Sequence, residues 1–164
     1  NDVKDEVASQ VRKEVVEKSK EDIVNFKDGK RHGKWILYHE SGQKKEETNW
    51  ENGKLDGKST WWDENGNVTK EISYKEGKRN GVTTRYYNNH QSMDMANYKD
   101  NKLDGKVFSW YKNGKKKAEE NYSEGKLESI GLYWDANGEV SNKKKTLGRK
   151  SWDKYIDDED DFLF

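Results

Sequence analysis

The sequence predicts a mainly β protein, an elongated antiparallel β-meander of stacked hairpin repeats, with an N-terminal helix and a short C-terminal cap or tail. Three observations predict this class. From residue 26 the chain aligns with itself, without a gap, in five rows of 24 residues; aromatic residues recur at two positions of each row, and glycines recur at three. A fixed period of this length is typical of repeat architectures, in which each unit is one supersecondary element.

Composition agrees with a repeat protein that lacks a thick aliphatic core. The 164 residues include only 26 Leu, Ile, Val and Phe, about 16%, yet 12% are aromatic and the 32 basic and 32 acidic side chains balance. Balanced charge and frequent rings favour a folded chain over a disordered one. No stretch approaches the ~18 apolar residues of a transmembrane helix. The absence of cysteine excludes disulfides, and the even charge balance gives no global attraction to nucleic acid.

Residues 1–20 predict an amphipathic helix. Asp2 precedes four valines spaced by four, which are Val3, Val7, Val11 and Val15. This spacing, with an acidic first turn, favours a helix with one narrow apolar stripe. We expect the stripe to cover the open end or one face of the repeat region.

Residues 21–141 predict the repeat domain, with about five hairpins. The first aromatic column consists of Phe26, Trp50, Tyr74, Tyr98 and Tyr122, and the second of Tyr38, Trp62, Tyr86, Trp110 and Trp134. Asn-Gly pairs at 65–66, 113–114 and 137–138 follow aromatic strands, and Asn-Gly favours primed hairpin turns. The other connection, from Glu76 to Gly81, is predicted to be longer and polar. Since one hairpin alone is marginal in water, we expect each hairpin to bury its rings against its neighbours, so that the aromatic ladder forms the core.

The glycine columns are predicted to be structural, because turns need positive φ at fixed points. Asn101, His90 and Ser129 stand where other rows have glycine. Asn tolerates the left-handed region, whereas His90 and Ser129 predict distorted turns and a partly unravelled last row. The predicted structural glycines are Gly29, Gly33, Gly53, Gly57, Gly66, Gly77, Gly81, Gly105, Gly114, Gly125 and Gly138.

Residues 142–164 predict a charged tail or cap. Lys143, Lys144 and Lys145 come first, five consecutive acids fill 157–161, and the chain ends Phe-Leu-Phe. A short helix or loose segment around Trp152 is expected at the far end, because a bare terminal strand of a repeat array invites pairing with other chains.

Two segments carry a resemblance to a known family. Tyr-Lys-Glu-Gly-Lys-Arg-Asn-Gly at 74–81 and Tyr-Lys-Asp-Asn-Lys-Leu-Asp-Gly at 98–105 resemble MORN repeats, and the match is closer to the bacterial MORN-variant form, often described as an antitoxin component. The resemblance covers about residues 21–141. It implies a scaffold, a protein-binding surface, a lipid-binding module or an antitoxin-like inhibitor of a partner protein, and no catalysis.

The residues themselves give no catalytic or metal-binding constellation. His32, His39 and His90 occupy three different repeat positions, so the register does not bring them to one point as a metal site requires. The segment beginning at Asp63 resembles the start of a calcium loop, but its twelfth residue is Tyr74 instead of the required glutamate. We therefore expect a turn there, no cofactor, no metal and no enzyme activity.

The favoured hypothesis is a non-enzymatic scaffold that binds a partner protein through an aromatic face. Adjacent strand residues such as Trp61 and Trp62 must point to opposite faces, so rings occupy both faces, either as two-sided packing or as one face left for a partner. The candidate partner-binding rings are Trp61, Tyr87, Tyr111 and Tyr133.

A lysine column supports an alternative, peripheral binding to anionic phospholipid. Each ammonium near a charged membrane contributes ~1 kcal/mol. An acidic or amide residue two positions before each lysine favours instead a compensated, solvated turn edge. The candidate anion-binding residues are Lys30, Lys54, Lys78, Lys102 and Lys126.

An exported, periplasmic or cell-surface location is favoured over a cytoplasmic one. The chain starts at Asn1 and lacks cysteine, which suits a removed export signal, although a trimmed chain would look the same.

Overall fold

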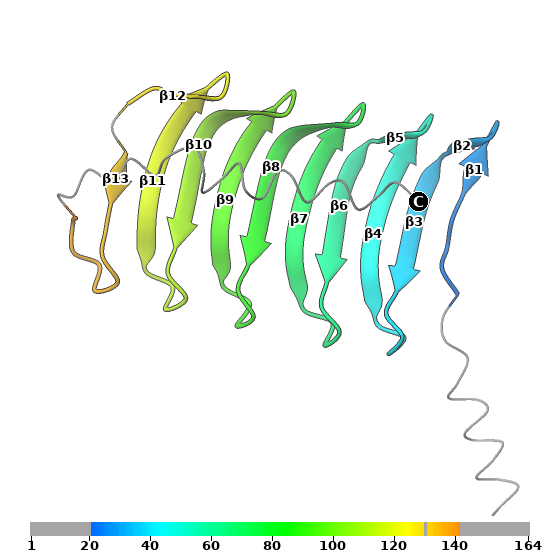
Figure 1. The fold of residues 1–164 in the computed structure, drawn as a ribbon, viewed down its shortest axis with the longest axis horizontal. Helices are drawn as coiled ribbons and strands as arrows, with labels where there is room; N and C mark the ends of the chain where they lie inside the picture. The colour runs from blue at the N-terminus through cyan, green and yellow to red at the C-terminus, as the bar shows by residue number, and fades with distance from the viewer. Residues whose placement is uncertain (1–20, 130, 142–164) are drawn as a thin grey trace, which may run out of the picture.

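The computed structural model describes residues 21–129 and 131–141 (Figure 1). The helix expected over 1–20 and the cap or tail expected over 142–164 lie outside the described residues. Within those residues the chain is built from β-strands, turns and irregular segments, with no helix. No helix of sufficient length and apolarity to span a membrane occurs in this part of the chain.

The strands form an antiparallel meander, which confirms the mainly β class and the meander topology that the sequence predicts. A two-stranded pair joins β1 to β2, and an eleven-stranded sheet runs in the order β12-β11-β10-β9-β8-β7-β6-β4-β3, with β13 beside β11 and β5 beside β4. The bounds are β1 Phe26–Lys27, β2 Lys30–Arg31, β3 Gly33–Tyr38, β4 Lys44–Glu51, β5 Lys54–Leu55, β6 Gly57–Trp62, β7 Val68–Lys75, β8 Lys78–Tyr86, β9 Ser92–Lys99, β10 Lys102–Trp110, β11 Lys116–Ser123, β12 Lys126–Leu127 and β13 Leu132–Tyr133.

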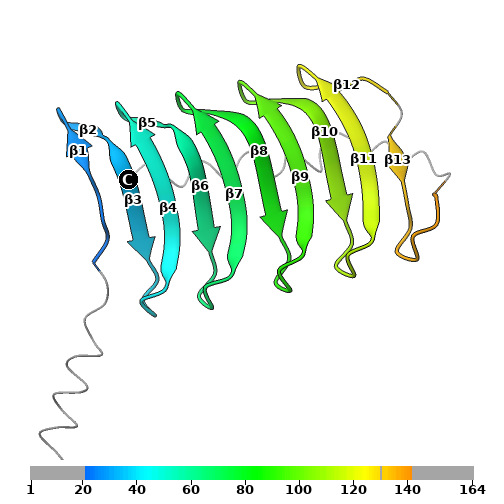
Figure 2. The ribbon, with the colours of Figure 1, turned by 180° about the vertical axis from the view of Figure 1, so that it is seen from behind.

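The described residues form one curved layer that is longer across the strands than along them (Figures 1 and 2). Successive repeats stand side by side in chain order, so every hairpin contacts the one before it and the one after it. No second layer formed by the described residues packs on either face. The fold therefore presents two broad faces and two edges made of turns.

The tight turns do not lie at the Asn-Gly pairs, where the sequence predicts them. Two consecutive residues with positive φ connect β7 to β8, Glu76 (φ 51°) and Gly77 (φ 81°), and the same pattern recurs at 28–29, 52–53, 100–101 and 124–125. Positive φ at both central residues defines a type I′ turn, whose twist matches that of the flanking strands. The connection predicted to be long is thus a two-residue hairpin turn.

The Asn-Gly segments form wider loops in place of the predicted primed turns. In the loop after β6, Gly66 N donates to Asp63 O at 3.0 Å and Asp63 N donates to Asn67 O at 2.9 Å. Gly66 has φ 82° whereas Asn65 has no positive φ, as in a turn followed by a glycine bulge. Asp63 Oδ1 also accepts from the backbone N–H groups of Asn65 and Asn67, so its carboxylate closes its own loop, as the turn interpretation expects.

His90 does not distort its loop, contrary to the prediction. It adopts φ 66° and donates its N–H to Tyr87 O at 3.0 Å, while Tyr87 N donates to Gln91 O at 2.8 Å. The loops that contain glycine at this position make the equivalent hydrogen bonds. The turn is therefore preserved with a histidine in the left-handed region. The last row, in contrast, is less regular as predicted, because only Leu132–Tyr133 is strand where β6 has six residues.

The second glycine column lies opposite the first aromatic column. Gly57 pairs with Tyr74 and Gly81 pairs with Tyr98, and the same pairing joins Gly33 to Trp50 and Gly105 to Tyr122. A ring packed over the bare backbone of a cross-strand glycine compensates for the missing side chain. All eleven glycines predicted to be structural have positive φ.

Hydrogen bonds also tie each tight turn to the preceding repeat. Gly77 N donates to Leu55 O at 2.8 Å, Gly53 N to Arg31 O, Asn101 N to Arg79 O and Gly125 N to Leu103 O. The tight turns are therefore joined by their own row of backbone hydrogen bonds. Adjacent repeats are held together by these bonds as well as by strand pairing.

The two aromatic columns do not form a single core. The register places Trp50, Tyr74, Tyr98 and Tyr122 on one face, and alternation places Trp62, Tyr86 and Trp110 on the other. The buried cluster consists of Ala96, Tyr98 and Val107, flanked by Leu103 and Tyr122. Stability is thus shared between two thin layers of rings, one on each face.

Candidate functional site

One face of the sheet, which we name Face A, carries a row of directly paired residues across nine strands. Directly opposed residues of antiparallel strands lie on the same face. The row begins at β3 and ends at β13. In order it reads Leu37, Glu46, Trp61, Lys70, Arg85, Asp94, Ser109, Ala118 and Tyr133.

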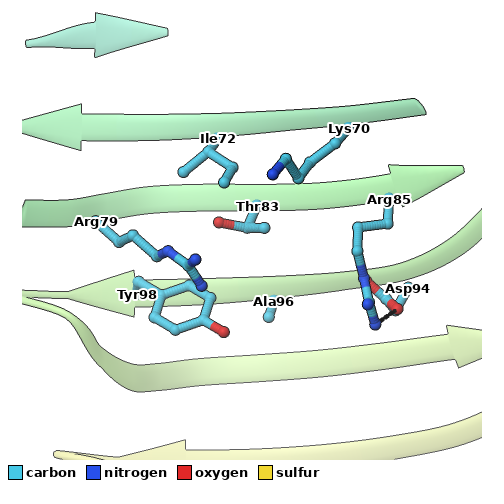
Figure 3. A pocket seen from close by; sticks show the side chains of 8 residues that line it. All are labelled: Lys70, Ile72, Arg79, Thr83, Arg85, Asp94, Ala96 and Tyr98. Carbon is cyan, nitrogen blue, oxygen red and sulfur yellow. Dashed lines mark hydrogen bonds and ion pairs between the residues drawn. The ribbon is translucent and has the colours of Figure 1, made fainter. Parts of the chain in front are cut away.

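A second row of Face A contains smaller side chains and lies between this row and the first aromatic column. It includes Ile72, Thr83, Ala96 and Val107, each paired with the next. Their exposed fractions are 2%, 7%, 2% and 1%. A shallow hollow of about 30 Å³ opens at its centre (Figure 3). That volume suits one or two waters at most, so the hollow alone is no site for an organic ligand.

The hollow is lined by three cations and one carboxylate (Figure 3). Arg85 pairs with Asp94 through two nitrogens, with Nε 3.0 Å from Oδ1. Lys70 Nζ lies 4.3 Å from the centre of the Trp61 ring, and the guanidinium of Arg79 lies 5.5 Å from that of Tyr98. Face A thus combines rings with positive charge at its centre.

Three carboxylates of Face A are deeply buried, Glu46 (6% exposed), Asp94 (4%) and Glu120 (3%), the last opposite Val107. Burial raises the pKa of Asp94 above its ordinary value although the Arg85 pair acts in the opposite direction, and burial likewise raises the pKa of Glu46. Around the hollow itself, three cationic side chains and one carboxylate line the surface.

All four predicted partner-binding rings lie on Face A. Trp61 and Tyr133 belong to the first row, separated by six strand-to-strand steps, about 29 Å at ~4.8 Å per step. Tyr87 and Tyr111 lie at the loop edge of the same face, where alternation from Arg85 and Ser109 places them. The fold thus places these four rings on one face but distributes them along it, without gathering them at one point.

None of the four rings is fully exposed, and all four bind within the chain, Trp61 through a side-chain hydrogen bond to Glu46. Tyr87 OH donates to Trp110 O at 2.9 Å, and Tyr111 OH donates to Trp134 O at 3.0 Å. Each bond joins one repeat to the next. Tyr133 OH donates to Glu120 Oε1 at 2.6 Å, and desolvation together with this carboxylate raises the pKa of Tyr133 far above its ordinary value. These rings therefore also hold the repeats together.

The opposite face, Face B, is more evenly charged. Its central row pairs Glu71, Thr84, Met95, Phe108 and Glu119. Lys106 and Lys116 both bind Glu119, each at 3.0 Å, and their hydrogen bonds lower the pKa of that carboxyl. Lys34 and Lys44 bind Glu47 in the same way. On Face B, therefore, these four lysines are paired with carboxylates of the same face.

The five lysines of the predicted column are exposed and lie on the tight-turn edge. The stems of Lys30 and Lys54 lie over the turn glycine of the following repeat, since a Cβ added to Gly53 or Gly77 would be 3.6 Å from them. Lys78 Nζ is 3.9 Å from Asp100 Oδ1. The column is therefore a stacked ridge whose stems pack along the edge.

The histidines lie apart from one another. His39 Nε2 is 2.9 Å from Trp62 O, and His32 Nδ1 is 3.6 Å from Glu51 Oε2. Within residues 21–129 and 131–141, no group of three or more His, Asp or Glu side chains is arranged to hold a metal ion.

Sequence reasoning did not find the cations of Face A. Lys70, Arg79 and Arg85 occupy three different positions of the 24-residue repeat, so they do not form a column like the aromatic residues and glycines. One signal was available: once 63–67 is recognised as a loop, antiparallel pairing sets Lys70 opposite Trp61.

Comparison with known families agrees with this geometry. The family model for the MORN repeat variant matches three segments, residues 31–52, 55–76 and 103–124. Each segment contains one wide loop and ends at the first central residue of a tight turn. The chain is therefore a MORN-repeat protein. MORN repeats are in general protein- or membrane-binding scaffold repeats and are not typically catalytic. No curated protein matches the chain.

Proposed function

We propose that this protein is a non-enzymatic scaffold that binds a partner protein through Face A. The observation that carries the proposal is the first row of Face A, which extends about 29 Å from Trp61 to Tyr133 with cations between rings. Aromatic residues and arginine are enriched at protein interfaces. An antitoxin-like inhibitor would be one form of such a scaffold, its partner being the inhibited protein. An exported location stays a prediction.

Neighbouring tryptophans provide the test. Trp61 lies on Face A and Trp62 on Face B, and both are half-buried. With the full chain as bait, we expect one stoichiometric protein to be retained at both low and high salt. Trp61→Ser should weaken that capture at least tenfold, whereas Trp62→Ser should not. Thermal unfolding of both variants controls for loss of structure, and equal loss of capture in two folded variants would refute a role for Face A.

The lysine ridge supports a second candidate, binding to an anionic lipid surface. Its supporting observation is that all five ammonium-bearing side chains are exposed on one edge, about 10 Å apart at two strand spacings per repeat. Binding to phosphatidylserine vesicles that disappears at high salt, and on joint Lys54→Gln, Lys78→Gln and Lys102→Gln substitution, would favour this function over the first.

A further inference from the structure

The centre of Face A has the chemistry of a surface that accepts an acidic segment. Lys70, Arg79 and Arg85, which we name the cationic strip, lie on β7 and β8 around the hollow (Figure 3). Asp94 is the one acidic residue among the eight that line it. The side chains that line the hollow therefore include three cations and one carboxylate. Rings of Trp61 and Tyr98 lie against its cations.

Buried hydroxyl groups on the same face also point to a ligand. Ser59 Oγ, Thr83 Oγ1 and Ser109 Oγ have no hydrogen-bond partner among the described residues, and these three residues are 0%, 7% and 8% exposed. All three belong to the paired rows of Face A. A buried hydroxyl without a partner is destabilising by ~1–3 kcal/mol, and a carboxylate or carbonyl oxygen of a bound segment would accept from it.

The chain itself contains a segment of matching composition. Residues 157–161 are five consecutive acids, preceded by Trp152 and Tyr155 and followed by Phe162 and Phe164. The acids complement the cationic strip, and the flanking rings complement its aromatic surroundings.

This segment is long enough to reach the strip. Ser141, whose N–H donates to Tyr133 O at 2.8 Å, marks the last described position beside β13. From there to Lys70 are six strand-to-strand steps, about 29 Å. The 16 residues from 141 to Asp157 span at most ~56 Å when extended. The acids can therefore meet the strip of their own chain.

We propose that residues 152–164 of this chain bind Face A, with their acidic run on the cationic strip. The C-terminal segment then occupies the surface that a partner would use, and a partner displaces it. Binding of residues 152–164 to Face A does not depend on a partner protein. Displacement of this segment by a partner rests on the proposed function.

A cysteine pair tests the contact in the full chain, which has no native cysteine. Thr83 on Face A and Thr84 on Face B are adjacent and equally buried, each 7% exposed. Thr83→Cys or Thr84→Cys is combined with Leu163→Cys and treated with a short flexible bismaleimide at micromolar protein concentration. We expect an intramolecular cross-link with position 83 in at least fivefold excess over position 84. Equal yields, or no cross-link at either position, would overturn the proposal.

A peptide of residues 150–164 tests the same contact in trans. The receptor is the full chain with its five acids changed to amides, Asp157→Asn through Asp161→Asn with Glu159→Gln. We expect binding at low salt that weakens at least tenfold in 1 M salt, where the Debye length is ~3 Å. Joint Lys70→Gln and Arg79→Gln should weaken it at least tenfold, whereas joint Lys58→Gln and Lys106→Gln on Face B should not.

The wild-type chain completes the comparison. A tethered segment competes at an effective concentration in the millimolar range, so wild type should bind the peptide at least tenfold more weakly than the amide-substituted receptor. Absence of peptide binding to that receptor, or equal binding to both chains, would overturn the proposal. These measurements contain no partner, so their failure leaves partner capture by Face A to be judged by the Trp61 and Trp62 variants.

Discussion

At the scale of single residues, His90 and Glu76 show how the repeat tolerates side chains in the left-handed region. His90 has φ 66° where the four other rows have glycine at φ 79–87°, and Glu76 has φ 51° at the first central position of a primed turn. This region is unfavourable for residues with a Cβ by roughly 1–2 kcal/mol. The hydrogen bonds of the turns are nevertheless formed, so the surrounding ladder holds these residues in place.

His90→Gly is therefore expected to stabilise the protein. Relief of the left-handed conformation outweighs the larger chain entropy of glycine, with a net gain of about 0.5 kcal/mol. The melting temperature should rise by a few degrees in a thermal unfolding experiment. The reverse change at the equivalent position, Gly114→His, should lower it. A lower melting temperature for His90→Gly would show that the imidazole makes a contact that outweighs its strain.

At the scale of the hairpin, the glycine opposite each ring marks the point where a strand leaves one neighbour and pairs with the next. Gly81 has φ 106° and lies at the register shift between the Tyr74–Arg79 and Ile72–Thr83 pairs. Its partner on the other side is Tyr98. A small residue at this point allows the ring to lie over the backbone.

Gly81→Ala should destabilise the fold by about 1–3 kcal/mol. The new Cβ would be 3.2 Å from the Cβ of Ser73, in addition to the unfavourable φ. Gly42→Ala is the matched control, because Gly42 has φ 79° and nothing within 4 Å of its added Cβ. Denaturant unfolding should show the greater loss for Gly81→Ala. Equal losses would mean that backbone conformation alone, and not packing, requires glycine here.

At the scale of the whole molecule, repeats contact only their neighbours. Strand pairs, turn-edge bonds such as Gly77 N to Leu55 O, and ring hydroxyl bonds such as Tyr87 to Trp110 O all join adjacent repeats. In such arrays, stability is close to a sum of repeat and interface contributions. The molecule should therefore accept a change in repeat number.

Deletion of residues 57–80 tests this view, because it joins Asp56 to Gly81, the equivalent of Gly57. We expect the shortened chain to fold as a β protein. Its m-value, the slope of unfolding free energy against denaturant concentration, should fall by about one fifth, because the m-value is proportional to the surface exposed on unfolding. Deletion of 57–68 removes half a repeat and should abolish cooperative unfolding. Cooperative unfolding of the half-repeat deletion, or none in the full-repeat deletion, would contradict the additive description.

Much of this architecture could be predicted from the sequence, because each of the five repeats shows the same pattern of aromatic residues and glycines. Five aligned rows determined the antiparallel meander, and strand alternation determined that Trp61 and Trp62 point to opposite faces. The positions that need positive φ were also recognisable as glycine columns. These properties depend on local backbone preference and on a side-chain period of two, which a sequence displays directly.

The tertiary structure alone decided which turn is tight and which is wide, and so which residues pair. Both connections contain glycine, and the choice depends on the twist of the flanking strands. It also decided that Lys70, Arg79 and Arg85 gather at one place on Face A. They occupy unrelated positions of the repeat, and only the register across β6 to β9 brings them beside Asp94 and the rings. Columns were visible in the sequence because they recur, whereas a site formed once, across strands, is not.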